Sequence, residues 1–138
     1  MSGAGINVVD METPGPRSAF VLVVEDDADL RAAVADILED EGFEVHVAEN
    51  GQDALTELGE LGTLGRRPCL VLLDLMMPVM DGFTFMERLL ADPGLRELPV
   101  VVLSASVKEP PRGARAMLRK PFEIPLLLDT VAGYCARG

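Results

Sequence analysis

The sequence predicts an α/β protein with a doubly wound sheet of five parallel strands and helices on both faces of the sheet. Short apolar runs rich in valine and leucine alternate along the chain with segments of helical periodicity. Such alternation builds βαβ units, in which successive strands lie parallel. The apolar runs are also continuous, which is typical of strands that are buried on both faces.

The size and composition of the chain predict one domain preceded by a leader. The chain has 138 residues, and 49% of them are hydrophobic, which suffices for a sizeable core. Residues 1–17 contain three glycines and two prolines and have no sustained periodicity. We therefore expect a flexible leader over residues 1–17 and a single domain over residues 18–138.

The first half of this domain predicts two strand–helix pairs. Phe20–Val24 is a continuous apolar run, as expected of a buried strand. Asp27 is a suitable N-cap for the helix that follows, and Gly42 is a suitable end for it. Apolar and polar residues alternate over Phe43–Ala48, which indicates a half-exposed edge strand. A helix over about residues 52–61 follows.

The second half of the domain predicts three further strands and two helices. A loop of glycine, arginine and proline precedes the third strand, and an Asp-Pro pair ends the helix after it. The expected elements are a buried strand over Cys69–Asp74, a helix over Phe83–Ala91, a strand over Pro99–Ser104, a short strand over Ala116–Arg119 and a final helix over Glu123–Ala136.

Charge and hydropathy argue against nucleic acid and membrane partners. The formal net charge is −11, and such a surface repels DNA, RNA and anionic lipid. The apolar runs are of strand length, and the N-terminus lacks the pattern of a signal peptide. We therefore expect a cytoplasmic protein. Cys69 and Cys135 form no disulfide framework, and we expect two buried thiols in a reducing cytosol.

Polar residues that could bind a metal ion or take part in a reaction follow several of the predicted strands. Since the carboxyl ends of parallel strands meet at one edge of the sheet, these side chains should lie together. Crowded carboxylates repel one another unless a cation neutralises them, and oxygen ligands suit Mg²⁺. A lysine and a hydroxyl would complete a site for a phosphoryl group, which a carboxylate can accept as an aspartyl phosphate. The residues concerned are Glu25, Asp26, Asp74, Ser104 and Lys120.

At this point the sequence resembles the receiver domains of two-component response regulators, the CheY-like family. The resemblance covers about residues 19–137 and implies the flavodoxin-like receiver fold with strand order 2-1-3-4-5. The Asp-x-x-Met-Pro-x-x-Asp-Gly run is its most specific part. The four matching blocks are Val21–Asp27, Asp74–Gly82, Ser104–Ala105 and Lys120–Pro121.

The resemblance implies a role for each residue of the constellation. It implies that Asp74 accepts the phosphoryl group and that Lys120 contacts it. Ser104 matches the switch hydroxyl, and Ala105 matches the small neighbour that leaves the phosphate accessible. The resemblance also implies that the peptide bond after Lys120 is cis. The magnesium ligands that it implies are Glu25, largely through water, Asp26, Asp74 and the backbone carbonyl of Met76.

Two departures from the family pattern bear on signalling. Ser104 and Lys120 are only 16 positions apart, and Pro110-Pro111 and Gly113 between them oppose a helix. We therefore predict that the fourth helix of the family is missing or very short. Met117 stands where the family has a mobile aromatic residue, and a methionine cannot supply the same rotamer switch.

The function that the resemblance implies is that of a phosphoacceptor in a phosphorelay, not an enzyme. A histidine kinase or a phosphotransfer protein would donate the group, and a downstream protein would read it. No output domain is expected, because the chain ends at Gly138 after the last helix. A protein-binding module that no longer uses phosphate is the alternative. A phosphatase with an aspartyl intermediate is disfavoured, because it needs an acid where this chain has Met76.

Overall fold

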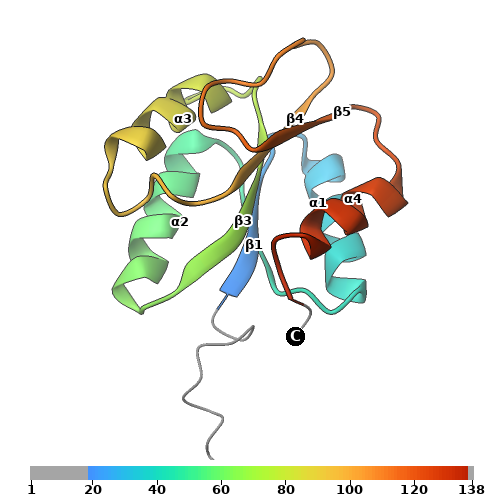
Figure 1. Ribbon diagram of the computed structural model, residues 1–138, viewed down its shortest axis with the longest axis horizontal. Helices are drawn as coiled ribbons and strands as arrows, with labels where there is room; N and C mark the ends of the chain where they lie inside the picture. Colours follow the sequence, from blue (N-terminus) through green and yellow to red (C-terminus); the bar gives the residue numbers. More distant parts are fainter. Residues whose placement is uncertain (1–18, 137–138) are drawn as a thin grey trace, which may run out of the picture.

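A computed structural model describes residues 19–136 (Figure 1). The leader expected over residues 1–17 lies outside the described residues, so it remains a prediction. Within the described part, no helix is both long and apolar enough to cross a bilayer.

The core of the fold is a sheet of five parallel strands in the order β2-β1-β3-β4-β5. The chain first builds β2 on one side of β1 and then returns to build β3 on the other side. In doubly wound sheets the functional crevice lies at the carboxyl ends of the two strands where the winding reverses, which here are β1 and β3. The strands are β1 (Ala19–Val24), β2 (Val45–Ala48), β3 (Arg67–Asp74), β4 (Val100–Ser104) and β5 (Ala116–Arg119).

Helices cover both faces of the sheet, as the sequence predicts (Figure 1). Alternate residues of β1 point to opposite faces: Phe20 and Leu22 pack in the cluster under α2 and α3, and Val21 packs in the cluster under α1 and α4. Every strand therefore contributes to two cores, which explains the continuous apolar runs. The helices are α1 (Ala28–Asp40), α2 (Gly51–Thr63), α3 (Gly82–Ala91) and α4 (Ile124–Ala132).

Side-chain caps fix where three of the helices begin. Asp27 accepts hydrogen bonds from the first turn of α1, which confirms its predicted role as an N-cap. Asn50 and Asp81 accept the amides of Asp53 and Thr84 at 2.8 Å and 2.9 Å. These caps satisfy amides that a helix leaves without partners, and they fix where each helix begins after the carboxyl end of the preceding strand.

No helix lies between β4 and β5, as the sequence predicts for the described residues 105–115. The helix labelled α4 follows β5 and is the predicted final helix. The irregular segment 105–115 packs against the side of α3, where a Cβ on Gly113 would lie 3.0 Å from the side chain of Leu90. Gly113 also has a φ of +94°, which a side chain would strain. Proline and glycine therefore shape this segment into an ordered loop.

The final helix is shorter than the sequence analysis predicts. It ends at Ala132 and not at Ala136, because Gly133 follows and the chain turns there. The next two residues still pack inward, and Cys135 is 6% exposed. The apolar spacing that suggested a longer helix therefore reflects burial of the turn.

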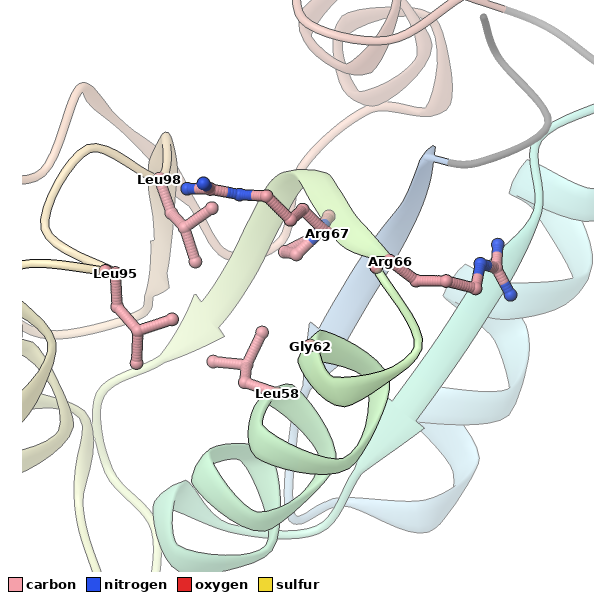
Figure 2. Close-up of a pocket in the computed structure, with 9 residues that line it drawn as sticks. Leu58, Gly62, Arg66, Arg67, Leu95 and Leu98 are labelled. Carbon is pink, nitrogen blue, oxygen red and sulfur yellow. The ribbon is translucent and has the colours of Figure 1, made fainter. Parts of the chain in front are cut away.

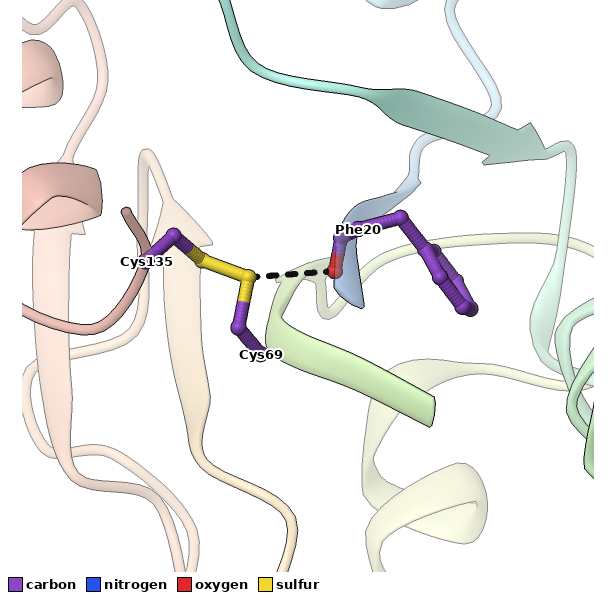
Figure 3. The surroundings of a disulfide bond; sticks show 3 residues. All are labelled: Phe20, Cys69 and Cys135. Carbon is purple, nitrogen blue, oxygen red and sulfur yellow. Dashed lines mark hydrogen bonds between the residues drawn. A yellow bond between two sulfur atoms is a disulfide. The ribbon is translucent and has the colours of Figure 1, made fainter. Parts of the chain in front are cut away.

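The expectation of two free thiols is wrong. Cys69 and Cys135 form a disulfide, with their Cα atoms 5.4 Å apart (Figure 3). Cys69 lies near the start of β3 and Cys135 follows α4, so both lie at the amino-terminal edge of the sheet on the same face. Their separation of 66 residues concealed this proximity in the sequence.

Candidate functional site

Three carboxylates meet at the carboxyl ends of β1 and β3. Glu25 and Asp26 follow β1 directly, and Asp74 is the last residue of β3. One oxygen of each lies within 4.8 Å of the others. Glu25 and Asp74 are 1% and 5% exposed, whereas Asp26 is open to solvent. The topology thus brings together the three acids that the sequence singled out, at the edge where the winding reverses.

Lys120 supplies a cation to this acidic group. Its Nζ lies 2.9 Å from Oε1 of Glu25 and 3.3 Å from Oδ1 of Asp74. The backbone N–H of Lys120 donates to the carbonyl of Ser104 at 2.9 Å, which continues the β4–β5 ladder to the edge of the site. The Lys120–Pro121 peptide bond is cis, as the family resemblance implied.

The crowding of these groups shifts their proton equilibria. Burial, followed by the negative charge of Glu25, raises the pKa of Asp74 to about 7, although Lys120 opposes the shift. Burial alone would lower the pKa of Lys120, but its hydrogen bond and attraction to Glu25, and then its contacts with Asp74, raise it. The site therefore carries more negative charge than one lysine offsets, which favours the uptake of a further cation or of a proton.

The donor set fits a hard divalent cation such as Mg²⁺. All three candidate side-chain ligands are carboxylates, and the exposed position of Asp26 leaves one side of the site open to water. Both oxygens of Glu25 already have partners, because Oε1 accepts from Lys120 and Oε2 accepts from the Asp27 amide at 3.2 Å. Glu25 is therefore better placed to bind a cation through water, and Asp26 and Asp74 are better placed for direct contact.

Met76 and Ser104 lie close to the acids but have different surroundings. The amide of Met76 lies 3.4 Å from Oδ1 of Asp74, and its side chain is 64% exposed. The Ser104 hydroxyl is buried and accepts hydrogen bonds from the amides of Ser106 at 3.2 Å and Val107 at 3.0 Å. The hydroxyl thus holds the start of the β4–β5 loop.

Arg31 belongs to the same region and was missed in the sequence. Its Nη1 donates to the carbonyl of Glu25 at 2.8 Å and lies 3.5 Å from the carbonyl of Asp26. The guanidinium of α1 therefore ties down the backbone of the acid pair. A lone arginine on a helix face, six residues after Glu25, gives no signal of this role without the fold.

Gly82 fixes the approach of α3 to the site. A Cβ at this position would lie 2.7 Å from the carbonyl oxygen of Asp74 and 2.8 Å from the backbone of Leu75. Gly82 also donates its amide to the carbonyl of Leu75 at 2.9 Å. The glycine in the Asp-Gly pair is therefore needed for close packing directly beneath Asp74.

A cavity of about 260 Å³ lies at the opposite edge of the sheet (Figure 2). Leu58 of α2, Leu95 and Leu98 line its apolar side, and Arg67 borders it. Arg66 also borders it, but its guanidinium turns away and binds Glu44 at 2.7 Å. This cavity is near the start of β3, whereas Asp74 is at its end, so the two sites are separate.

The family model described as the response regulator receiver domain matches residues 21–132. The chain therefore belongs to the response regulator receiver family. It is 42% identical over 112 residues to the alkaline phosphatase synthesis transcriptional regulatory protein SphR of Synechococcus elongatus, a match that covers 74% of this chain and 43% of SphR. It is 40% identical over 124 residues to the DNA-binding response regulator MtrA of Mycobacterium tuberculosis, which covers 86% of this chain and 51% of MtrA.

Solved structures agree with this assignment. The chemotaxis protein CheY4 of Vibrio cholerae has a TM-score of 0.73 at 30% identity, covering 84% of this chain and 98% of CheY4. The receiver domain of the hybrid histidine kinase CckA has a TM-score of 0.69 at 30% identity, covering 86% of this chain and all of that domain. The chain spans about half the length of the curated regulators named above.

Proposed function

We propose that this chain is a phosphoacceptor whose Asp74 receives a phosphoryl group from a histidine kinase or a phosphotransfer protein. The observation that carries the proposal is the placement of Asp74, which is buried within reach of Lys120 and beside the acids Glu25 and Asp26. Asp26, Asp74 and the backbone carbonyl of Met76 would hold Mg²⁺ directly, and Glu25 would do so through water. When bound, Mg²⁺ offsets the charge on the phosphoryl oxygens.

The chemical step is an in-line displacement at phosphorus. A carboxylate oxygen of Asp74 forms the new O–P bond, and the P–N bond to the donor histidine breaks, with the electron pair leaving on that nitrogen. Lys120, which contacts the Asp74 carboxylate, is placed to stabilise the negative charge of the phosphoryl oxygens once the group is attached there. Because the pKa of Asp74 is raised to about 7, a cation in the acid group favours the ionised, nucleophilic form.

The route from Asp74 to a partner would run through Ser104 and the loop after it. The Ser104 hydroxyl accepts the amides of Ser106 and Val107, so a turn of this hydroxyl towards a phosphoryl group would free both amides. The loop over residues 105–115 takes the place of the missing helix, and its exposed Lys108 and Arg112 are basic in a chain of net charge −11. This loop is therefore our proposed surface for a downstream protein.

The proposed partners and location follow from this role. We propose that the domain acts in the cytoplasm, is not an enzyme with turnover, and makes no direct contact with nucleic acid or membrane. Some relatives are named DNA-binding regulators, but this chain spans about half of their length. Its net charge of −11 opposes binding to a phosphate backbone.

A phosphate-independent binding module is the second candidate. The missing helix favours it, and so does Met117, which is partly buried against the core where the family has a mobile aromatic residue. Phosphorylation of the purified chain separates the two candidates. In this experiment the chain is incubated with acetyl phosphate and Mg²⁺, and its intact mass is then measured.

The controls for this experiment are an Asp74→Asn variant, an Asp81→Asn variant and a sample with chelator. Asp81 caps α3 and is the matched acid outside the carboxylate group. A gain of one phosphoryl group in the native chain and in Asp81→Asn, but not in Asp74→Asn or with chelator, supports the proposal. A native chain that gains no mass from acetyl phosphate or from a phosphorylated histidine donor favours the binding module.

A further inference from the structure

The disulfide between Cys69 and Cys135 joins two segments that are 66 residues apart in the sequence. Cys69 is the third residue of β3, and Cys135 lies three residues beyond the end of α4 (Figure 3). Both belong to the apolar cluster on the face covered by α1 and α4. The bond therefore fastens the segment after α4 to the start of β3, the middle strand of the sheet.

Helix α4 has few interactions of its own that would hold it in place without this bond. The helix has nine residues, and Leu127 and Val131 are its two buried side chains. No side chain caps its first turn, and Ile124 and Leu126 are each 51% exposed. Such a short helix has little stability of its own and relies on tertiary contacts. Without the bond, α4 would be held only by noncovalent packing, mainly of Leu127 and Val131 with a contribution from the partly buried Leu128.

The surroundings also suit the reduced form of the two cysteines. The sulfur of Cys69 lies 3.3 Å from the carbonyl oxygen of Phe20 (Figure 3). In the disulfide this sulfur carries no hydrogen, but as a thiol it would find an acceptor already in place. Cys135 is 6% exposed in an apolar cluster, which suits a neutral thiol. Reduction would therefore strand no polar group in the core.

We infer that Cys69 and Cys135 form a site of reversible oxidation that sets how firmly α4 is held. This inference rests on the proposed function in one respect, because a phosphorelay partner acts in the cytoplasm, where protein disulfides are usually transient or sensory. The reductant that we propose is a dithiol. It would attack Cys69, because Cys69 is the more exposed of the two cysteines.

The exchange conserves atoms and electrons. One thiolate of the dithiol attacks the sulfur of Cys69, the S–S bond breaks, and Cys135 leaves as a thiolate that takes up a proton. The second thiolate of the dithiol then displaces Cys69. The dithiol becomes a cyclic disulfide, and the protein gains two electrons and two protons. Oxidation by a disulfide of the same class reverses these steps.

A redox titration of the native chain tests the inference. The protein is equilibrated in mixtures of reduced and oxidised dithiothreitol without denaturant or phosphodonor, and it is then alkylated and its intact mass measured. The expected result is a reversible change from no added group to two as the dithiol fraction rises. In the reduced form, amide exchange over residues 124–136 should be at least tenfold faster, while exchange in β1 and β3 is unchanged.

Two results would overturn the inference. Two alkylated thiols under fully oxidising conditions would mean that the bond does not form. A bond that resists reduction until urea unfolds the chain would mark a permanent crosslink. Cys69→Ser and Cys135→Ala variants should show rapid α4 exchange that dithiothreitol does not alter. Because the titration uses no phosphodonor, its outcome is independent of labelling at Asp74, and an Asp74→Asn variant should titrate like the native chain.

Discussion

The ammonium of Lys120 lies 3.3 Å from a carboxylate oxygen of Asp74, although 46 residues separate the two in the chain. The same ammonium lies 2.9 Å from Glu25, so one cation bridges the ends of two neighbouring strands. Both carboxylates are almost fully buried. The lysine therefore contributes to the stability of the fold as well as to the chemistry proposed for Asp74.

Replacement of Lys120 by methionine should destabilise the chain in the absence of divalent cations. It would leave Glu25 and Asp74 as buried carboxylates without their cation, and breaking a buried pair in this way costs about 3–5 kcal/mol. Urea unfolding at pH 8 measures the loss. Lys108→Met, at an exposed position, is the matched control and should change stability by less than about 0.5 kcal/mol. Equal stabilities for the two variants would contradict the bridging role.

The stability of the metal-free chain should depend on pH through Asp74. Its pKa rises from the ordinary 3.8 to about 7 in the folded state, so between these pH values the folded chain holds the proton more firmly than the unfolded chain. The contribution of Asp74 to the free energy of unfolding must then fall as the pH rises from about 4 to 7. Asp74→Asn removes this dependence and should raise the melting temperature at pH 8 by several degrees.

The measurement is a series of thermal melts with chelator from pH 4 to 8, for the native chain and for Asp74→Asn. The difference in melting temperature between the two should be small near pH 4 and greatest above pH 7. A difference that is constant across the series would show that Asp74 titrates normally.

Binding of Mg²⁺ should stabilise the folded chain by mass action. A ligand at 100 times its dissociation constant adds about 2.7 kcal/mol to the free energy of unfolding. Asp26→Asn should weaken Mg²⁺ binding without disturbing the core, because Asp26 belongs to the carboxylate group but is exposed to solvent. Asp36→Asn on the exposed side of α1 makes the same change in charge away from the site.

Thermal melts in a magnesium titration check this prediction. The native chain and Asp36→Asn should show the same rise in melting temperature, and Asp26→Asn should need at least tenfold more Mg²⁺. If all three respond alike, the stabilisation comes from general screening of charge and not from the carboxylate group.

The Ser104 hydroxyl should control the order of the loop that follows it. Ser104→Ala removes the acceptor of the Ser106 and Val107 amides and should cost about 1 kcal/mol. Amide exchange at residues 106 and 107 should become faster, while β4 stays protected. Ser104→Thr keeps a hydroxyl and should preserve the slow exchange. Fast exchange at both amides in the native chain would show that the Ser104 hydroxyl does not hold them.

Gly113 should be more sensitive to substitution than a glycine in a helix. Gly113→Ala places a Cβ at a φ of +94° and 3.0 Å from Leu90, so it should destabilise the chain by about 1–2 kcal/mol. Gly59→Ala in α2 meets nothing within 4 Å and should stabilise it by up to about 1 kcal/mol. Chemical unfolding of both variants checks this prediction, and equal changes in stability for the two would contradict it.

The strands and the acid group could be predicted because their signals are local. Buried parallel strands give continuous apolar runs, and Glu25, Asp74 and Ser104 stand at the ends of such runs. Lys120 follows the short strand β5. The prolines and Gly113 likewise ruled out a helix before β5 by backbone chemistry alone. These features needed no knowledge of which segments meet in space, apart from the rule that parallel strands end at one edge.

The features that escaped prediction depend on contacts between distant segments. The pairing of Cys69 with Cys135 follows from the return of the chain end to the start of β3, which two isolated cysteines do not reveal. The bond from Arg31 to the Glu25 carbonyl requires the tilt of α1 relative to β1. The early end of α4 was hidden by apolar residues after Gly133 that are buried without being helical.

The position of β1 between β2 and β3 also has a consequence for the chain while it is being synthesised. Once β1, α1 and β2 have been made, one side of β1 is still without its neighbour, because β3 begins only at Arg67. Until then Phe20 to Val24 form an apolar strand with a bare edge, the kind of surface that recruits other nascent chains. Truncated products that stop short of β3 therefore keep this apolar edge unpaired, which favours their aggregation.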